Sequence, residues 1–177
     1  MDFDRELWKE VVAFHGHECP GLAIGFRAVR IALDKLGVTR AKDEELLAIV
    51  ETDACSVDAV QVVAGCSMGK GNLIYKNHGK QAFTIVNRKT GQAVRVYVDA
   101  SKLAVDKDDR MARMTMILTA PEEEFCKSEF VDIELPEKAR IFPSVVCECC
   151  GEKMAEIRAR IQKGKIVCLA CFEDYSR

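Results

Sequence analysis

The sequence predicts an α+β fold, in which a mixed core of helices and strands precedes a small finger of the treble-clef or zinc-ribbon type. The chain has 177 residues and 49% of them are hydrophobic, which is enough for one medium core. Apolar residues recur with a helical period in some segments and form short, strand-like runs in others. After Pro143 the composition shifts to closely spaced cysteines. We therefore expect a core domain over residues 1–140 and a finger over residues 141–177.

The core domain is predicted to open with two helices. A helical period of apolar residues favours one helix over residues 2–14 and a second from Pro20 to Leu36. Proline suits the first position of a helix, because its missing N–H has no intrahelical partner there. Gly37 can adopt the left-handed conformation that ends a helix. The residues that set the period of the first helix are Phe3, Leu7, Val11 and Phe14.

The rest of the core domain is predicted to alternate between short strands and helices. The segment 88–92 separates two apolar runs and contains turn-forming residues, which is typical of a β-hairpin. Gly65 marks the end of a preceding helix. In chain order the predicted elements are a strand over 46–50, a helix over 56–64, paired strands over 82–87 and 93–98, a helix over 111–118 and a strand over 131–135.

Charge and cysteine content argue against several classes of protein. The 26 Lys and Arg residues balance 28 Asp and Glu residues, so the net charge of −2 provides no driving force toward nucleic acid or an anionic membrane. We find no signal peptide and no apolar run of membrane-spanning length, and we expect a cytoplasmic protein. In a reducing compartment the nine cysteines indicate metal or redox sites rather than disulfides.

The tail contains two C-x2-C pairs with the spacing of a structural zinc site. Cys147 and Cys150 form the first pair, and Cys168 and Cys171 form the second after residues 151–167. Two tight turns of this kind enclose a tetrahedral ion and leave no position open for catalysis. We expect a hairpin of segments 157–161 and 166–167 between the pairs and a short helix over 172–175. The extra Cys149 is interpreted as a bystander. The near-neutral charge of the tail argues against nucleic-acid binding on electrostatic grounds.

A second group of candidate ligands lies near the start of the chain, in the pattern His15-x-His17-x-Cys19. Alternate residues of an extended segment point to one side, so these three side chains are predicted to converge on one metal ion or substrate. Cys19 also precedes a predicted helix start, where free N–H groups and the helix dipole stabilise a thiolate. The alternatives are that Cys19 is a small buried hydrophobe and that His15 only caps the first helix.

Cys55 occupies a similar position, because it follows a predicted strand and opens a predicted helix. Such connections often carry functional residues. Asp58 lies one helical turn further on, where it can orient a ligand or hold a proton. We therefore include Cys55 and Asp58 in the candidate site. Cys66 and His78 are further polar neighbours whose participation the sequence leaves open.

Residues 65–72 form a glycine-rich loop that lacks the spacing of a P-loop, because Gly71 rather than Ser or Thr follows Lys70. The tetrad from Ser67 to Lys70 matches one element of a serine acyl-enzyme motif, but that element alone is common. We interpret the loop as a close-approach turn near the site. Lys70 and Asn72 are weak candidates for binding an anionic cofactor.

Three segments carry a resemblance to a known family. They are FHGHECPGLAIG at residues 14–25, DACSVDAVQ at 53–61 and GCSMGKGNL at 65–73. Together they resemble the FmdE family of formylmethanofuran dehydrogenase subunits over most of residues 5–135, and longer members of that family are similar in carrying a C-terminal zinc finger. The resemblance implies an α+β core, a homodimer, a metal site at the His-x-Cys segment with nearby cysteines, and a link to molybdenum or tungsten enzymes.

The leading hypothesis is a metal-binding accessory protein for an oxidoreductase partner of the molybdenum or tungsten type. His17 and Cys19 would be ligands or reactive groups, Cys55 would complete the site, and His15 and Asp58 would lie behind them. The metal of this front site is left unidentified. One alternative is a small enzyme in which a bound metal activates water, or in which Cys19 attacks an electrophile with His17 as base. Another is a zinc-finger regulator that senses metal at the front.

Overall fold

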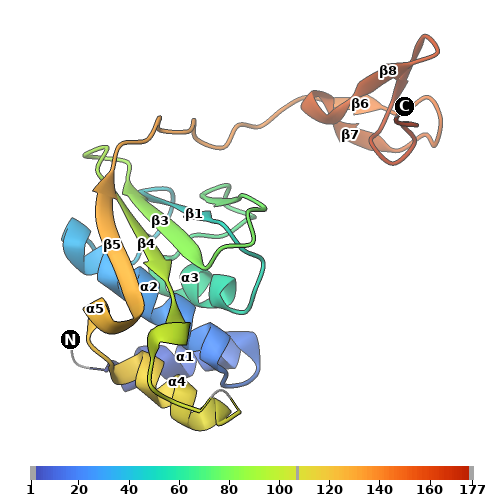
Figure 1. Cartoon of the computed structure of the whole chain (residues 1–177). Coiled ribbons are helices and arrows are strands. Elements are labelled where there is room, and N and C mark those ends of the chain that lie inside the picture. The colour runs from blue at the N-terminus through green and yellow to red at the C-terminus, as the bar shows by residue number, and fades with distance from the viewer. Residues whose placement is uncertain (1–2, 107, 176–177) are drawn as a thin grey trace. The chain divides into compact units, whose positions relative to one another are not determined.

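The computed structural model describes residues 3–106 and 108–175 (Figure 1). The chain divides into two compact units, Met1–Ala139 and Arg140–Arg177. The first unit has the mixed helix and sheet architecture of an α+β domain, as the sequence predicts. Within the described residues no helix is both long enough and apolar enough to cross a lipid bilayer.

The helices of the first unit follow the predicted pattern. The start predicted at residue 2 lies outside the described residues, and the first helix begins after Asp4, whose carboxylate accepts a hydrogen bond of 3.0 Å from the N–H of Leu7. The second helix has the predicted bounds, with Pro20 in its first turn and Gly37 in the left-handed conformation. The helices are α1 (Arg5–His15), α2 (Pro20–Leu36), α3 (Ser56–Ala64), α4 (Arg110–Thr119) and the short α5 (Glu122–Phe125), with a 3-10 turn η1 (Ala100–Lys102).

Five strands form one mixed sheet in the order β2-β1-β3-β4-β5. Only β1 and β2 are parallel, and the predicted hairpin is confirmed as β3 and β4. The strand predicted over 131–135 is wrong, because β5 covers Cys126–Val131 and pairs with β4 from Val98↔Cys126 to Ala93↔Val131. Its polar residues suit an exposed sheet edge. For the same reason the segment lacks the continuous apolar run from which a strand is predicted. The strands are β1 (Leu46–Val50), β2 (Leu73–Tyr75), β3 (Ala82–Asn87), β4 (Ala93–Val98) and β5 (Cys126–Val131).

The main core lies between α2 and one face of the sheet, where α2 contacts β3, β4 and β5 (Figure 1). α3 also packs closely against α2: a Cβ added to Gly25 would lie 2.0 Å from the carbonyl oxygen of Ser56. Glycine is therefore required there for the two helices to approach each other. This close approach brings the first turns of α2 and α3 together.

β1 is buried on both of its faces, which explains its continuous apolar sequence. Leu46, Ala48 and Val50 belong to the main core, whereas Leu47 and Ile49 join a smaller apolar cluster on the opposite face. Ile133, from the segment after β5, packs against this second cluster, and residues Arg88 and Pro136 fix that segment through a hydrogen bond of 2.6 Å.

The finger unit consists of two short antiparallel hairpins. The hairpin predicted between the cysteine pairs is confirmed, although its first strand begins at Arg160 and residues 156–158 form a 3-10 turn. The helix predicted over 172–175 is wrong. The backbone N–H and C=O of Glu173 bond to the side chain of Gln162, which holds this segment beside the hairpin. The finger is thus ribbon-like over the described residues. Its strands are β6 (Ser144–Val146), β7 (Lys153–Ala155), β8 (Arg160–Gln162) and β9 (Lys165–Val167).

Two candidate metal centres

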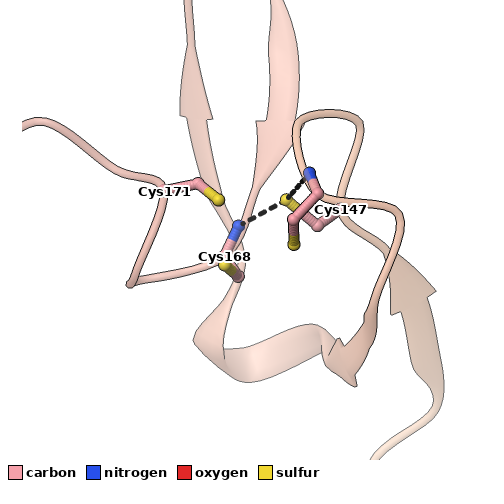
Figure 2. A group of neighbouring side chains, drawn as sticks. Cys147, Cys168 and Cys171 are labelled. Atoms are coloured by element: carbon pink, nitrogen blue, oxygen red, sulfur yellow. Dashed lines mark hydrogen bonds between the residues drawn. The ribbon is translucent and has the colours of Figure 1, made fainter.

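The four cysteines predicted to bind zinc converge in the finger unit. Their sulfur atoms all lie within 4.8 Å of one another. Figure 2 shows the sulfur of Cys147 facing Cys168, with Cys171 on the other side of Cys168. The Sγ atom of Cys147 accepts hydrogen bonds from the backbone N–H of Cys150 at 3.5 Å and of Cys168 at 3.3 Å. These donors hold the pKa of the Cys147 thiol at about 6, well below its ordinary value.

This donor set fits a structural zinc ion. Four thiolates complete a tetrahedral shell, and backbone N–H groups directed at a sulfur favour the thiolate form that binds metal. Each pair lies on a tight turn, closed by hydrogen bonds from Gly151 N to Cys147 O and from Cys171 N to Cys168 O. Cys149 is exposed and lies outside the group of four ligands. A zinc ion here would supply folding free energy to a unit that has little core of its own.

The first unit contains the second cluster, formed by His15, His17 and Cys19 and called the front cluster below. One ligand atom of each lies within 4.8 Å of the others. The Nε2 atom of His15 is 3.9 Å from the Sγ atom of Cys19, and the rings of His15 and His17 have centroids 4.5 Å apart. The extended conformation predicted for this segment is wrong at its start, because His15 ends α1 and the chain turns at Gly16 with φ 95°. A helix end followed by a turn brings the three side chains together instead.

Cys19 occupies the N-cap of α2, as its position before Pro20 predicts. Its sulfur accepts a hydrogen bond of 3.3 Å from the backbone N–H of Leu22. The residue is only 4% exposed, yet its sulfur faces an imidazole rather than apolar side chains alone. The connection before it is held by Trp8, whose indole N–H donates to Glu18 at 2.9 Å.

Asp58 supports the cluster from α3. Its Oδ2 atom is 2.7 Å from the Nδ1 atom of His15, and its Oδ1 atom accepts from the amide of Gln61 at 3.2 Å. Because a carboxylate only accepts, this contact favours the tautomer of the neutral ring with its proton on Nδ1, in which the Nε2 lone pair is directed toward Cys19. The leading hypothesis placed both His15 and Asp58 behind the ligands, whereas the His-x-His-x-Cys pattern made His15 a candidate ligand. The structure places His15 within the cluster and Asp58 behind it.

Cys55 lies beside Cys19, although the two residues are 36 positions apart in the sequence. It stands at the N-terminus of α3, as predicted, and both sulfurs lie close to Gly21. A Cβ added to Gly21 would be 3.8 Å from the sulfur of Cys55 and 3.9 Å from that of Cys19. Burial and the neighbouring Cys19 raise the pKa of the Cys55 thiol. A bound cation would have the opposite effect, since it favours the thiolate.

A cavity of about 440 Å³ opens beside this cluster. His15, Cys55 and Asp58 line it, so a ligand in the cavity would contact one member of the cluster, His15, together with its neighbours Cys55 and Asp58. Asp53, Met68 and Tyr75 line it elsewhere, and sequence reasoning did not assign any of them to the site. Asp53 and Met68 stand in segments that carry the family resemblance, whereas nothing in the sequence marked Tyr75.

The structure gives Lys70 and Asn72 supporting contacts within the glycine-rich loop. The amino group of Lys70 donates to the carbonyl oxygen of Gly65. The Asn72 amide is fully buried: its oxygen accepts from Ser67 N at 2.9 Å, and its nitrogen donates to the carbonyls of Asp43 and Leu46 at 2.9 and 3.1 Å. We therefore assign Asn72 to loop support rather than to cofactor binding.

Cys66 and His78 lie apart from the front cluster. Cys66 is fully buried in the main core, and burial raises the pKa of its thiol to about 12. His78 instead bonds to the carboxylate of Glu51 at 3.0 Å, which Arg95 also contacts at 2.8 Å. Neither residue belongs to the group of ligand atoms around Cys19.

The fold and the two cysteine-containing clusters define a metal-binding α+β protein with a zinc finger. Residues 14–129 match the family model described as FmdE, molybdenum formylmethanofuran dehydrogenase operon. The chain therefore belongs to the FmdE family. Residues 140–177 match the prokaryotic dksA/traR C4-type zinc finger, which agrees with the four converging cysteines.

Two individual proteins are similar to most of the chain. A crystal structure of a tungsten formylmethanofuran dehydrogenase FmdE-like protein from Syntrophus aciditrophicus has a TM-score of 0.71 and 26% identity, covering 94% of this chain and 90% of that one. A "Probable S-adenosyl-L-methionine-binding protein" of Archaeoglobus fulgidus is 39% identical over 192 residues, which cover 92% of this chain. The match spans about half, 51%, of that relative's length.

Proposed function

We propose that this protein is a cytoplasmic, metal-binding accessory protein of a molybdenum- or tungsten-type oxidoreductase system, and that its first unit holds a second metal ion. His15, His17 and Cys19 would bind this ion, with Cys55 as the fourth ligand. The observation that carries the proposal is the contact of His15 with Asp58 on one side and Cys19 on the other.

That arrangement is typical of metal-ligating histidines. A carboxylate that accepts the proton of one ring nitrogen fixes the tautomer and makes the other nitrogen a better ligand. The distance of 3.9 Å between Cys19 Sγ and His15 Nε2 is close to the separation of two ligands on one tetrahedral ion with bonds of about 2.0–2.3 Å. Mixed imidazole and thiolate donors favour zinc or another borderline transition metal over magnesium or calcium.

The names of similar proteins support the accessory role. The family description refers to a molybdenum formylmethanofuran dehydrogenase operon, and the similar crystal structure is named after a tungsten enzyme of the same kind.

Nine cysteines, none in a disulfide, suit a reducing compartment. From the family resemblance we also propose that the chain forms a homodimer. The molar mass of the purified chain in solution, measured by light scattering, tests this.

Metal analysis of purified protein tests the front site. We expect two metal ions per wild-type chain and one in Cys19→Ser, with the finger's zinc retained. Cys126→Ser is a matched control, because Cys126 is a partly buried thiol outside both clusters. Full metal content in a folded Cys19→Ser protein would remove Cys19 from the ligands and defeat the proposed site.

The accessory role needs a separate experiment. The tagged chain, purified under native conditions from its own source, should carry a partner fraction containing molybdenum or tungsten, detected by elemental analysis. A partner fraction without either metal would contradict the accessory role and leave the metal site standing.

A small metal-dependent enzyme is the second candidate, and the cavity beside the cluster favours it. If Cys55 does not bind the ion, a fourth coordination position would be open to water or substrate, and the cavity lined by His15 and Cys55 would give access to it. Cobalt(II) at the front site would then show a visible spectrum that shifts on adding azide. The name of the Archaeoglobus relative adds S-adenosyl-L-methionine as a compound to test in the same cavity.

A further inference from the structure

We propose that Cys19 and Cys55 form a dithiol redox pair, which closes to a disulfide by exchange with a low-molecular-weight disulfide and so releases the metal ion of the front site. The release of metal rests on the proposed function, whereas the disulfide itself depends only on the two thiols. Disulfides that form in reducing compartments are characteristically transient and redox-sensing. Helix packing holds the two sulfurs together, and a difference in their exposure sets the order of reaction.

The packing of α2 against α3 places the two thiols side by side. The position of a Cβ built on Gly21 lies 3.9 Å from the sulfur of Cys19 and 3.8 Å from that of Cys55. Burial is the main cause that raises the pKa of the Cys55 thiol, and its hydrogen bond with the Cys19 side chain is the second. The close backbone approach at Gly25 fixes the spacing of the two helices, so the fold itself assembles the pair.

The two thiols differ in their access to a reagent. Cys55 is partly exposed and lines the cavity of about 440 Å³, whereas Cys19 is 4% exposed and is not among the described residues that line it. The sulfur of Cys19 also caps α2 through the N–H of Leu22, while Cys55 makes no side-chain cap bond on α3. A small disulfide that enters the cavity therefore meets Cys55 first.

The reaction balances over two exchanges. The thiolate of Cys55 attacks one sulfur of the small disulfide, whose S–S bond breaks as a mixed disulfide forms and one thiolate leaves. The thiolate of Cys19 then attacks the sulfur of Cys55 and displaces the second small thiolate. This step is intramolecular and is favoured by the proximity of the two sulfurs. The protein dithiol is oxidised, the reagent is reduced to two thiols, and these take up the two protons that the cysteines lose.

The other two thiols of the first unit are poorly placed for this reaction. Cys66 is fully buried in the main core, and Cys126 is neither in the front cluster nor among the described residues that line the cavity. Only a thiolate sulfur is a ligand of the kind proposed for the front site. Closure of the pair would therefore remove both proposed sulfur ligands and leave the imidazoles of His15 and His17 alone.

Disulfide mapping of the full chain tests the inference. The purified protein is incubated with oxidised glutathione, its remaining thiols are blocked, and its peptides are identified by mass spectrometry. We expect a linked pair of peptides that carry Cys19 and Cys55, with the loss of the front metal, and both changes should reverse on adding dithiothreitol and zinc. Cys126→Ser should form the same linkage as wild type. Absence of the linkage, or a linkage that leaves the front metal bound, would overturn the proposal.

Two variants test the order of reaction. Cys19→Ser should accumulate a mixed disulfide between glutathione and Cys55, because no second thiol displaces the glutathione. Cys55→Ser should gain no glutathione at Cys19, because that sulfur is buried. A stable adduct on Cys19, or none on Cys55, would overturn the assigned order.

Metal analysis before oxidation separates this inference from the proposed function. A wild-type chain that holds two metal ions and forms no linkage defeats the redox pair alone. A chain whose metal content does not depend on Cys19 defeats the proposed metal site, and the mapping experiment then decides on the redox pair by itself.

Discussion

At the scale of single residues, Cys19 combines a structural role with a chemical one. Its sulfur replaces the usual oxygen acceptor at a helix N-cap and so binds the N–H of Leu22. The same sulfur faces the imidazole of His15. One side chain therefore both caps α2 and belongs to the group of candidate metal ligands.

Asp58→Asn should weaken the front metal without unfolding the protein. The amide keeps a carbonyl acceptor but loses the negative charge of the partner that orients His15, and weakening such a partner lowers metal affinity by about 10–100-fold. Competition with a chromogenic chelator measures this change. Asp34→Asn, at an exposed position on α2, serves as the control, and an unchanged affinity in Asp58→Asn would show that the charge of Asp58 does not support the metal site.

Glu51→Gln should destabilise the first unit by about 2 kcal/mol at neutral pH. The carboxylate is buried between Arg95 and His78, and these partners lower its pKa, with the hydrogen bond from Arg95 the largest cause. A lowered pKa means that the stabilisation is present above the ordinary value of 4.5 and is lost as the pH falls through the folded-state value.

Urea unfolding at several pH values checks this prediction. The difference between wild type and Glu51→Gln should be largest at neutral pH and should close as the pH falls below 4.5. Glu129→Gln, which removes an exposed carboxylate on β5, should leave stability unchanged. A difference that is independent of pH would mean that the charge of Glu51 plays no part.

At the scale of elements, the close packing of α2 and α3 creates the front site. Gly21 and Gly25 lie on the side of α2 that faces the start of α3, and each lacks the Cβ that would keep the helices apart. The N-terminal turns of both helices therefore meet, and each presents a cysteine there. His15 joins them because α1 ends beside α3, where Asp58 holds it.

Gly25→Ala should separate the two helices and cost at least about 2 kcal/mol of stability. Alanine favours a helix by about 1 kcal/mol, but its Cβ would meet the backbone oxygen of Ser56 at 2.0 Å. The clash is with backbone, so it dominates. Thermal unfolding and front-metal content should both fall.

Gly69→Ala is the matched control, since a Cβ at that position meets nothing within 4 Å. It should change neither stability nor metal content. A Gly25→Ala protein as stable as Gly69→Ala would show that α2 and α3 are not in close backbone contact.

At the scale of the whole molecule, the chain consists of two units that are stabilised in different ways. The first unit has a continuous apolar core, whereas the finger leaves Ile157, Ile161 and Tyr175 exposed. Small units without a large core depend on metals or other crosslinks. Zinc at the four cysteines would provide that crosslink.

Chelation of zinc should unfold the finger and leave the first unit folded. Heteronuclear NMR spectra should lose dispersion for residues 147–175 and keep it for the core of the first unit. Cys168→Ser should reproduce the effect, whereas Cys149→Ser should retain finger zinc because Cys149 lies outside the four-ligand group. A finger whose spectrum is unchanged without zinc would contradict a structural role for the metal.

The sequence by itself determined the features that depend on local pattern. The bounds of α2, the β3–β4 hairpin and the zinc finger follow from residue period, turn chemistry and cysteine spacing. It did not find β5, whose polar residues face outward at a sheet edge, or the extended end of the finger, where Gln162 replaces helical hydrogen bonds.

Only the tertiary structure decided which distant residues share a site. It joined Cys19 to Cys55, set Asp58 behind His15, separated Cys66 and His78 from both, and opened the cavity beside Asp53 and Tyr75. The physical reason is that helix periods and turns are encoded within a few residues. The separation of two packed helices depends instead on side-chain volumes far apart in the chain, here on the absence of one at Gly25.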